Sequence, residues 1–138
     1  MMLPPQVGAD ELDDPFWEGC RRHELLVHRC GECQRSYWPA TSCTEHGWAP
    51  MVWVPAAGTG EVHTYTVFHH AVLPALADRV PYVVAVVQLD EGPFFHTDLL
   101  GCGPDDVHVG QRVEVVFEDA ADGWVLPHFR PARPEQAP

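Results

Sequence analysis

From Gly60 onward, apolar residues recur in the short runs that are typical of β-strands. Residues 62–69, 82–89 and 94–100 are rich in β-branched and aromatic side chains, and turn sequences separate them. Residues 112–118 alternate between apolar and polar positions, and residues 124–130 form a fifth run. Five strands with no convincing helix among them predict a small closed barrel of the OB type.

The chain before residue 60 follows other patterns. Residues 10–24 carry apolar side chains at roughly helical spacing, which predicts a short helix. Asp13 or Asp14 is the expected N-cap, and Pro15 is the expected first helical residue. The bulky apolar residues of this stretch are Phe16, Trp17 and Cys20. Because so short a helix is marginal in water, it must dock either on the barrel or on a partner.

Between the helix and the barrel, the sequence predicts a ribbon of short strands. Apolar and aromatic residues at 25–28, 37–39 and 51–54 mark three candidate strands. Aromatic padding is expected from Trp38, Trp48 and Trp53. Residues 55–58 (PAAG) have the composition of a linker to the barrel.

Two short pairs of potential metal ligands lie within this ribbon. Cys30-Gly-Glu-Cys33 and Cys43-Thr-Glu-His46 each have two intervening residues. This spacing is typical of a tetrahedral Zn²⁺ site with three thiolates and one imidazole. Four protein ligands leave no open position for water, so the predicted role of the metal is structural. A rubredoxin-like iron centre is the alternative, and the imidazole of His46 favours zinc.

The predicted fold is therefore mainly β and has four segments. Residues 1–24 form an N-terminal arm and helix, and residues 25–57 form a rubredoxin-like zinc ribbon. Residues 58–131 form the five-stranded OB-fold barrel. Residues 132–138 are rich in Pro and Ala and are expected to be a disordered tail.

Composition and charge narrow the possible functions. The formal net charge is -12, which argues against nucleic acid as a partner because phosphates would be repelled. No apolar run is long enough to span a membrane, and no basic region precedes an apolar stretch at the N-terminus. We expect a cytoplasmic protein, in which the cysteine pairs remain reduced and bind metal. Cys20 and Cys102 lie outside the metal cluster and are expected to be small apolar fillers.

Several segments together resemble one known family. They are residues 15–19 (PFWEG), the three ribbon cysteines, 58–62 (GTGEV), 64–67 (TYTV), 81–85 (PYVVA), 109–115 (VGQRVEV) and 126–131 (LPHFRP). The family joins an N-terminal rubredoxin-like zinc ribbon to a C-terminal OB fold and is associated with acyl-CoA metabolism. The resemblance extends over residues 13–132, and it departs from the common pattern at His46, where a fourth Cys is usual.

This resemblance implies an accessory subunit without activity of its own. Members of this family are similar to accessory partners of thiolase-fold enzymes. These partner enzymes include acyltransferases and aldolases that degrade steroid side chains. The thiolase-fold partner would hold the catalytic residues in a hetero-oligomer and act on a coenzyme A ester, and a hydratase is a candidate further partner. This chain would complete or stabilise the acyl-CoA site.

No catalytic residue is predicted, because no nucleophile motif is present and the carboxylate pairs lie at turns. Two sets of residues are instead expected to line a partner or its substrate. One set is the two aromatic residues of the helix, which are expected to be exposed. The other set is three residues in or beside the loop at residues 71–80. Together they are Phe16, Trp17, His69, Arg79 and Tyr82. The alternative function is a free-standing acyl-CoA-binding module that uses the barrel face.

Overall fold

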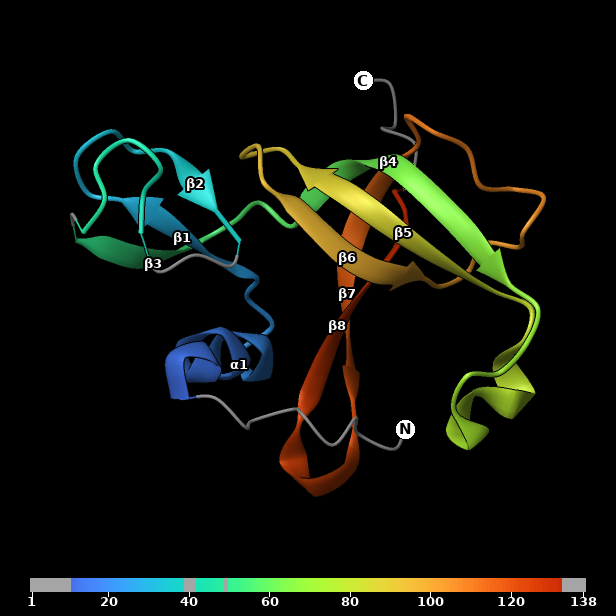
Figure 1. The fold of residues 1–138 in the computed structure, drawn as a ribbon. Coiled ribbons are helices and arrows are strands. Elements are labelled where there is room, and N and C mark those ends of the chain that lie inside the picture. The colour runs from blue at the N-terminus through green and yellow to red at the C-terminus, as the bar shows by residue number, and fades with distance from the viewer. Residues whose placement is uncertain (1–10, 39–41, 49, 133–138) are drawn as a thin grey trace, which may run out of the picture.

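The computed structural model describes residues 11–38, 42–48 and 50–132 (Figure 1). The predicted N-terminal arm and residues 133–138 of the predicted tail lie outside these ranges. The fold is mainly β, as the sequence predicts, with one short α-helix before two separate sheets. None of the helices in the described ranges is both long and apolar enough to cross a membrane.

The first sheet is a three-stranded antiparallel ribbon with the order β2-β1-β3. Its strands are β1 (Leu26–Cys30), β2 (Ser36–Tyr37) and β3 (Met51–Pro55). Each lies within two residues of a predicted strand, although β2 is shorter than expected. Trp38 and Trp53 are half-buried as expected, but the prediction for Trp48 is wrong, because its side chain is 91% exposed.

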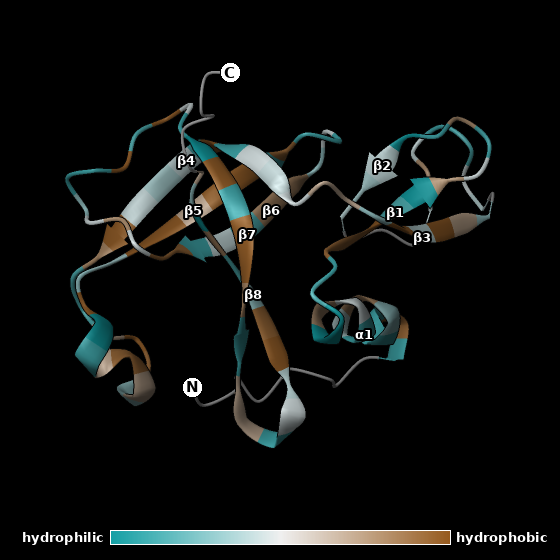
Figure 2. Ribbon diagram, turned by 180° about the vertical axis from the view of Figure 1, so that it is seen from behind, coloured by the Kyte–Doolittle hydropathy of each residue, from teal (hydrophilic) through white to brown (hydrophobic). Residues whose placement is uncertain are grey.

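The second sheet is a closed five-stranded barrel with the strand order β4-β5-β6-β8-β7. Its strands are β4 (Thr59–Phe68), β5 (Tyr82–Leu89), β6 (Phe94–Leu99), β7 (Arg112–Asp119) and β8 (Val125–Pro131). All neighbours are antiparallel except β6 and β8, which meet in parallel at Leu99 and Phe129. Hydrophilic and hydrophobic segments alternate along β7 (Figure 2), as expected for a strand with one face toward the core.

One connection in the barrel differs from the sequence prediction. The β4–β5 connection, expected to be a loop, contains a 3₁₀ helix, η2 (Pro74–Arg79). β4 ends at Phe68, so His69 follows the strand instead of belonging to it. A further 3₁₀ helix, η3 (Ala121–Gly123), forms the acidic turn between β7 and β8.

Helix α1 (Asp14–Arg21) is shorter than predicted and follows a 3₁₀ turn, η1 (Glu11–Asp13). Asp13 is the N-cap residue but its side chain makes no capping hydrogen bond, and Pro15 is the second helical residue instead of the first. The helix ends because His23 adopts a positive φ of 60°, while the N–H of Glu24 donates to the C=O of Gly19.

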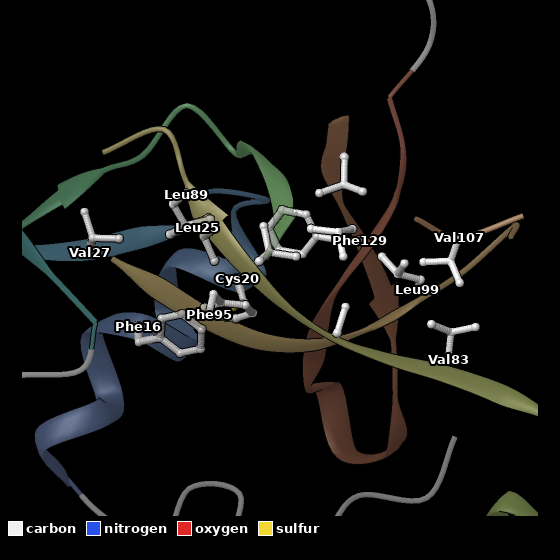
Figure 3. Packing of buried hydrophobic residues seen from close by; sticks show 14 of the residues in the cluster. Phe16, Cys20, Leu25, Val27, Val83, Leu89, Phe95, Leu99, Val107 and Phe129 are labelled. Carbon is white, nitrogen blue, oxygen red and sulfur yellow. The ribbon is translucent and has the colours of Figure 1, made fainter. Parts of the chain in front are cut away.

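The helix docks on the barrel at its weakest seam. Phe16 is only 4% exposed and packs on Phe95 of β6, which in turn packs on Phe129 of β8 (Figure 3). Because β6 and β8 share a single paired position, these rings fill space that strand pairing leaves open. The expectation that Phe16 is exposed is therefore wrong: its ring belongs to the core.

Candidate functional site

The two predicted ligand pairs form two turns of the same design. The N–H of Glu32 lies 3.4 Å from Cys30 Sγ, and the N–H of Glu45 lies 3.4 Å from Cys43 Sγ. Two residues later, a residue with positive φ, Gln34 or Gly47, returns its N–H to the C=O of the first cysteine at 2.9 Å. Each turn therefore places a backbone N–H beside the sulfur of its first cysteine and closes on the C=O of the same residue.

The four side chains converge on one point. One ligand atom from each of Cys30, Cys33, Cys43 and His46 can be chosen so that all four lie within 4.8 Å of one another. Cys33 Sγ lies 3.7 Å from Cys43 Sγ, and His46 Nδ1 lies 3.6 Å from Cys43 Sγ and 3.8 Å from Cys30 Sγ. A tetrahedral Zn²⁺ with ordinary bond lengths requires about 3.8 Å between sulfurs and about 3.6 Å between sulfur and nitrogen. The cluster can therefore hold a metal ion.

Electrostatics at this cluster favour the thiolate form of Cys43. The hydroxyl of Tyr37 lies 3.3 Å from Cys43 Sγ and, together with the N–H of Glu45, lowers the pKa of this thiol to about 5. Thiolates, and not thiols, are metal ligands. The sequence predicted only a strand at Tyr37, because the spacing of the ligands does not show that its hydroxyl reaches Cys43.

The remaining cysteines have other surroundings. Cys20 of α1 is fully buried against the core, and burial raises the pKa of its thiol to about 12. Cys102 is half-buried, and burial followed by the nearby carboxylate of Asp106 raises its pKa. Neither thiol is poised to react at neutral pH.

Two of the five predicted lining residues meet in a groove at the end of the barrel. Arg79 and Tyr82 line a space of about 490 Å³ between η2 and strands β5 and β6. Its other walls include Leu76, Pro81, Leu100 and Cys102. His69 is exposed and is not among the lining residues. Trp17 lies at the other side of the barrel, half-buried against Trp124 at a ring-centroid distance of 5.8 Å.

A polar network that no sequence motif indicated lies beside this groove. His128 of β8 is 4% exposed, and its Nδ1 forms a hydrogen bond with the carboxylate of Asp98 from β6. Its Nε2 lies 3.5 Å from Glu118 of β7, and the same carboxylate accepts a hydrogen bond from Arg79 of η2 at 3.3 Å. Four elements are thus joined by one chain of charged and polar groups.

Comparison with known proteins identifies the family. A family profile described as the C-terminal OB-fold domain of ChsH2 matches residues 53–118. The fold superposes on a solved structure named Ltp2-ChsH2(DUF35) aldolase with a TM-score of 0.79 and 35% identity, over 88% of this chain and 95% of that chain. The chain belongs to the DUF35 family. This agrees with the resemblance to a ribbon-plus-OB family tied to acyl-CoA metabolism.

Curated relatives of this DUF35 chain differ in length. A Thermomonospora curvata protein named "Probable enoyl-CoA hydratase alpha subunit" is 39% identical over 93% of this chain. A Mycobacterium tuberculosis protein named "3-oxo-4,17-pregnadiene-20-carboxyl-CoA hydratase alpha subunit" is 30% identical over 94%. The chain spans about 40% of the length of each. A Methanocaldococcus jannaschii "DUF35 domain-containing scaffold protein" is 33% identical over 75% of this chain and 77% of that protein.

Proposed function

We propose that this chain is a non-catalytic accessory subunit of a thiolase-fold acyl-CoA enzyme. The similarity to the Ltp2-ChsH2(DUF35) aldolase carries the proposal, because it extends over 95% of that chain at 35% identity. The scaffold name of the M. jannaschii relative and the subunit names of the two hydratase relatives support a role within a complex. The partner would hold the catalytic residues, and this chain would complete or stabilise its acyl-CoA site.

The proposed reaction of the complex is the aldol cleavage of a steroid side chain carried as a coenzyme A ester. The name of the M. tuberculosis relative supports this substrate class, because it describes a steroid acid joined to coenzyme A. The word aldolase in the name of the similar structure supports the reaction. A hydratase is a candidate further partner, since two relatives are named as hydratase subunits.

We propose Zn²⁺ as the metal of the ribbon, held by Cys30, Cys33, Cys43 and His46. The match between the measured separations and tetrahedral geometry supports it. With four protein ligands, the ion would stabilise folding and offer no open position to a substrate. The thiolate ligands also support a cytoplasmic location, where cysteines stay reduced. Elemental analysis of the purified chain should find one zinc per chain, and stoichiometric iron would contradict the assignment.

Affinity capture from the native host tests the accessory role. The tagged chain should co-purify with a thiolase-fold protein in near-stoichiometric amount, and aldol cleavage of the acyl-CoA should need both chains. Capture with the tag alone is the control. Repeated recovery of the chain without a thiolase-fold partner would contradict the proposal.

The groove lined by Arg79 and Tyr82 favours one alternative, a free-standing acyl-CoA-binding module. Its volume of about 490 Å³ is within the range of small-molecule sites. Calorimetric titration of the isolated chain with coenzyme A and an acyl-CoA separates the two functions. The alternative expects micromolar binding that Arg79→Ala weakens, and the accessory role expects none without the partner.

A further inference from the structure

The second half of β4 has an edge that pairs with no other strand of the described chain. β5 accompanies β4 along almost its whole length, from Gly60 to Phe68. On the other side, β7 pairs only with residues 59–61. Figure 1 shows β4 and β5 extending together from the barrel toward η2. Beyond Val62, therefore, this side of β4 is an open strand edge.

The hydrogen bonds around Val62 show which way the backbone faces before this edge begins. The N–H of Val62 donates to the C=O of Gln111 at 3.0 Å, and its C=O accepts from the N–H of Gly110 at 2.8 Å. Val62 therefore faces away from β5. Because successive residues of an antiparallel strand face opposite sides, Glu61, which pairs with Gln88, faces β5.

The same reasoning assigns the residues of the open edge. Gln88 faces β4, so Val86, Val84 and Tyr82, which follow at steps of two, also face β4. Their partners across the bulge are Thr64, Thr66 and Phe68. Tyr65 and Val67 lie between these partners, so their N–H and C=O groups point to the open edge. Two residues there offer two donors and two acceptors to a further strand.

Beyond the bulge at Val62, the residues along this edge include no Asp, Glu, Lys, Arg or Pro that would oppose strand pairing. Charged residues and prolines commonly prevent edge strands from associating. Residues 62–73 contain neither, although 20% of the chain is charged. Tyr65 is 38% exposed, and the adjoining connection exposes Val72 and Leu73, at 66% and 48%. The edge is thus uncharged, partly apolar and accessible.

We propose that the open edge of β4 docks an extended strand of a different polypeptide, the enzyme partner of the proposed complex. This inference rests on the proposed function and names the surface that would bind the partner. A strand added at Tyr65 and Val67 would satisfy their backbone groups and extend the sheet. The net charge of -12 favours a different, less acidic chain over a second copy, because two copies would repel each other.

Amide hydrogen exchange, measured on the full chain alone and in the captured complex, tests the surface. In the free chain, the amides of Tyr65 and Val67 should exchange rapidly, while those of Thr64 and Thr66 are protected by β5. In the complex, Tyr65 and Val67 should gain at least about tenfold protection. A complex in which these two amides stay unprotected would overturn the inference and leave the accessory role intact. Protection that rises with the concentration of the free chain would instead identify a second copy as the occupant.

A pair of variants at one position separates backbone pairing from side-chain contact. Tyr65→Pro removes an N–H that points outward and should weaken binding to the partner about tenfold, since edge positions tolerate proline. Tyr65→Ala also removes the ring but keeps that N–H, and should weaken binding far less. Equal losses in both variants would overturn strand pairing. Should Tyr65→Pro fail to fold, as judged by its metal content and melting, the exchange experiment decides alone.

Discussion

The ribbon and the barrel are neighbouring β-structures of one chain, but different forces stabilise them. The ribbon has strands of two to five residues and brings four ligand atoms to one point. The barrel has strands of six to ten residues around buried side chains such as Val62, Val87 and Phe129. The proposed zinc would stabilise the ribbon through a few directional bonds, whereas the barrel depends on apolar area removed from water.

The comparison also shows how the two regions are joined. Phe16 of α1 lies 5.3 Å from Trp38 of the ribbon and 6.3 Å from Phe95 of the barrel, measured between ring centroids. Val27 of β1 is fully buried in the same cluster. The ribbon thus contributes apolar side chains to the core, and the proposed zinc would keep these side chains in position.

The largest effect is expected from the ribbon's metal centre. Cys43→Ser should abolish metal binding and unfold the ribbon, because structural zinc contributes roughly 10–16 kcal/mol in small modules. The barrel should persist with its own core, so NMR spectra should lose dispersion for residues 26–55 and retain it for the barrel. Cys102→Ser, outside the cluster, is the matched control and should keep the metal. Coincident unfolding of both regions would show that the ribbon and barrel are one cooperative unit.

A smaller but still severe effect is expected from the barrel core. Phe129→Ala should lower the free energy of unfolding by about 3–5 kcal/mol, since the ring is fully buried at the parallel seam. Urea denaturation followed by circular dichroism measures the loss. Phe94→Ala, at a ring that is 44% exposed, should cost no more than about 1 kcal/mol. Similar losses in both variants would contradict the core assignment.

The next largest loss of stability is expected from the polar network around His128. His128→Ala leaves the carboxylates of Asp98 and Glu118 without their shared imidazole, and should destabilise the chain by about 1–3 kcal/mol. Chemical denaturation measures this loss. Exchange of the η2 amides should also increase, because Glu118 holds Arg79 of η2. Unchanged η2 exchange would show that the network does not position this helix.

The sequence predicted the features that depend on residues close together in the chain. Runs of β-branched and aromatic residues, and alternation in residues 112–118, located all five barrel strands within a few residues. The spacing of Cys30 with Cys33 and of Cys43 with His46 located both turns that carry the candidate metal ligands. Each of these signals is local, since one strand or one turn is enough to display it.

Features that depend on residues far apart in the chain could not be predicted from the sequence. Phe16 was predicted to be exposed and to line a partner, although it belongs to the core, because helical spacing does not say what a helix covers. Asp98, Glu118 and His128 come from three strands and meet only when the barrel closes. His128 lies in a segment that matched the family, but no spacing linked it to either carboxylate.

The smallest effect is expected at the surface ion pair between Asp90 and Arg112, which lies at one end of the barrel. Arg112 donates to both carboxylate oxygens of Asp90 at 2.8 and 2.9 Å, and Thr59 donates to one of them. Arg112 and then Thr59 hold the pKa of Asp90 below its usual value. The ionised form is therefore favoured in the folded state, so its stabilisation is complete above the unfolded pKa of about 4 and disappears as pH falls through the lower folded pKa.

Asp90→Asn should therefore lower stability at pH 7 by only about 0.5–1 kcal/mol, because both side chains are about half exposed and solvent screens the pair. The difference between the two proteins should shrink at low pH and also in high salt. Melting temperatures measured from pH 7 down to about pH 3 check this. A difference that stayed constant with pH would mean that Asp90 stabilises the turn through its shape and not its charge. In that case, this end of the barrel would be stabilised by packing, as the core is, and not by the ion pair.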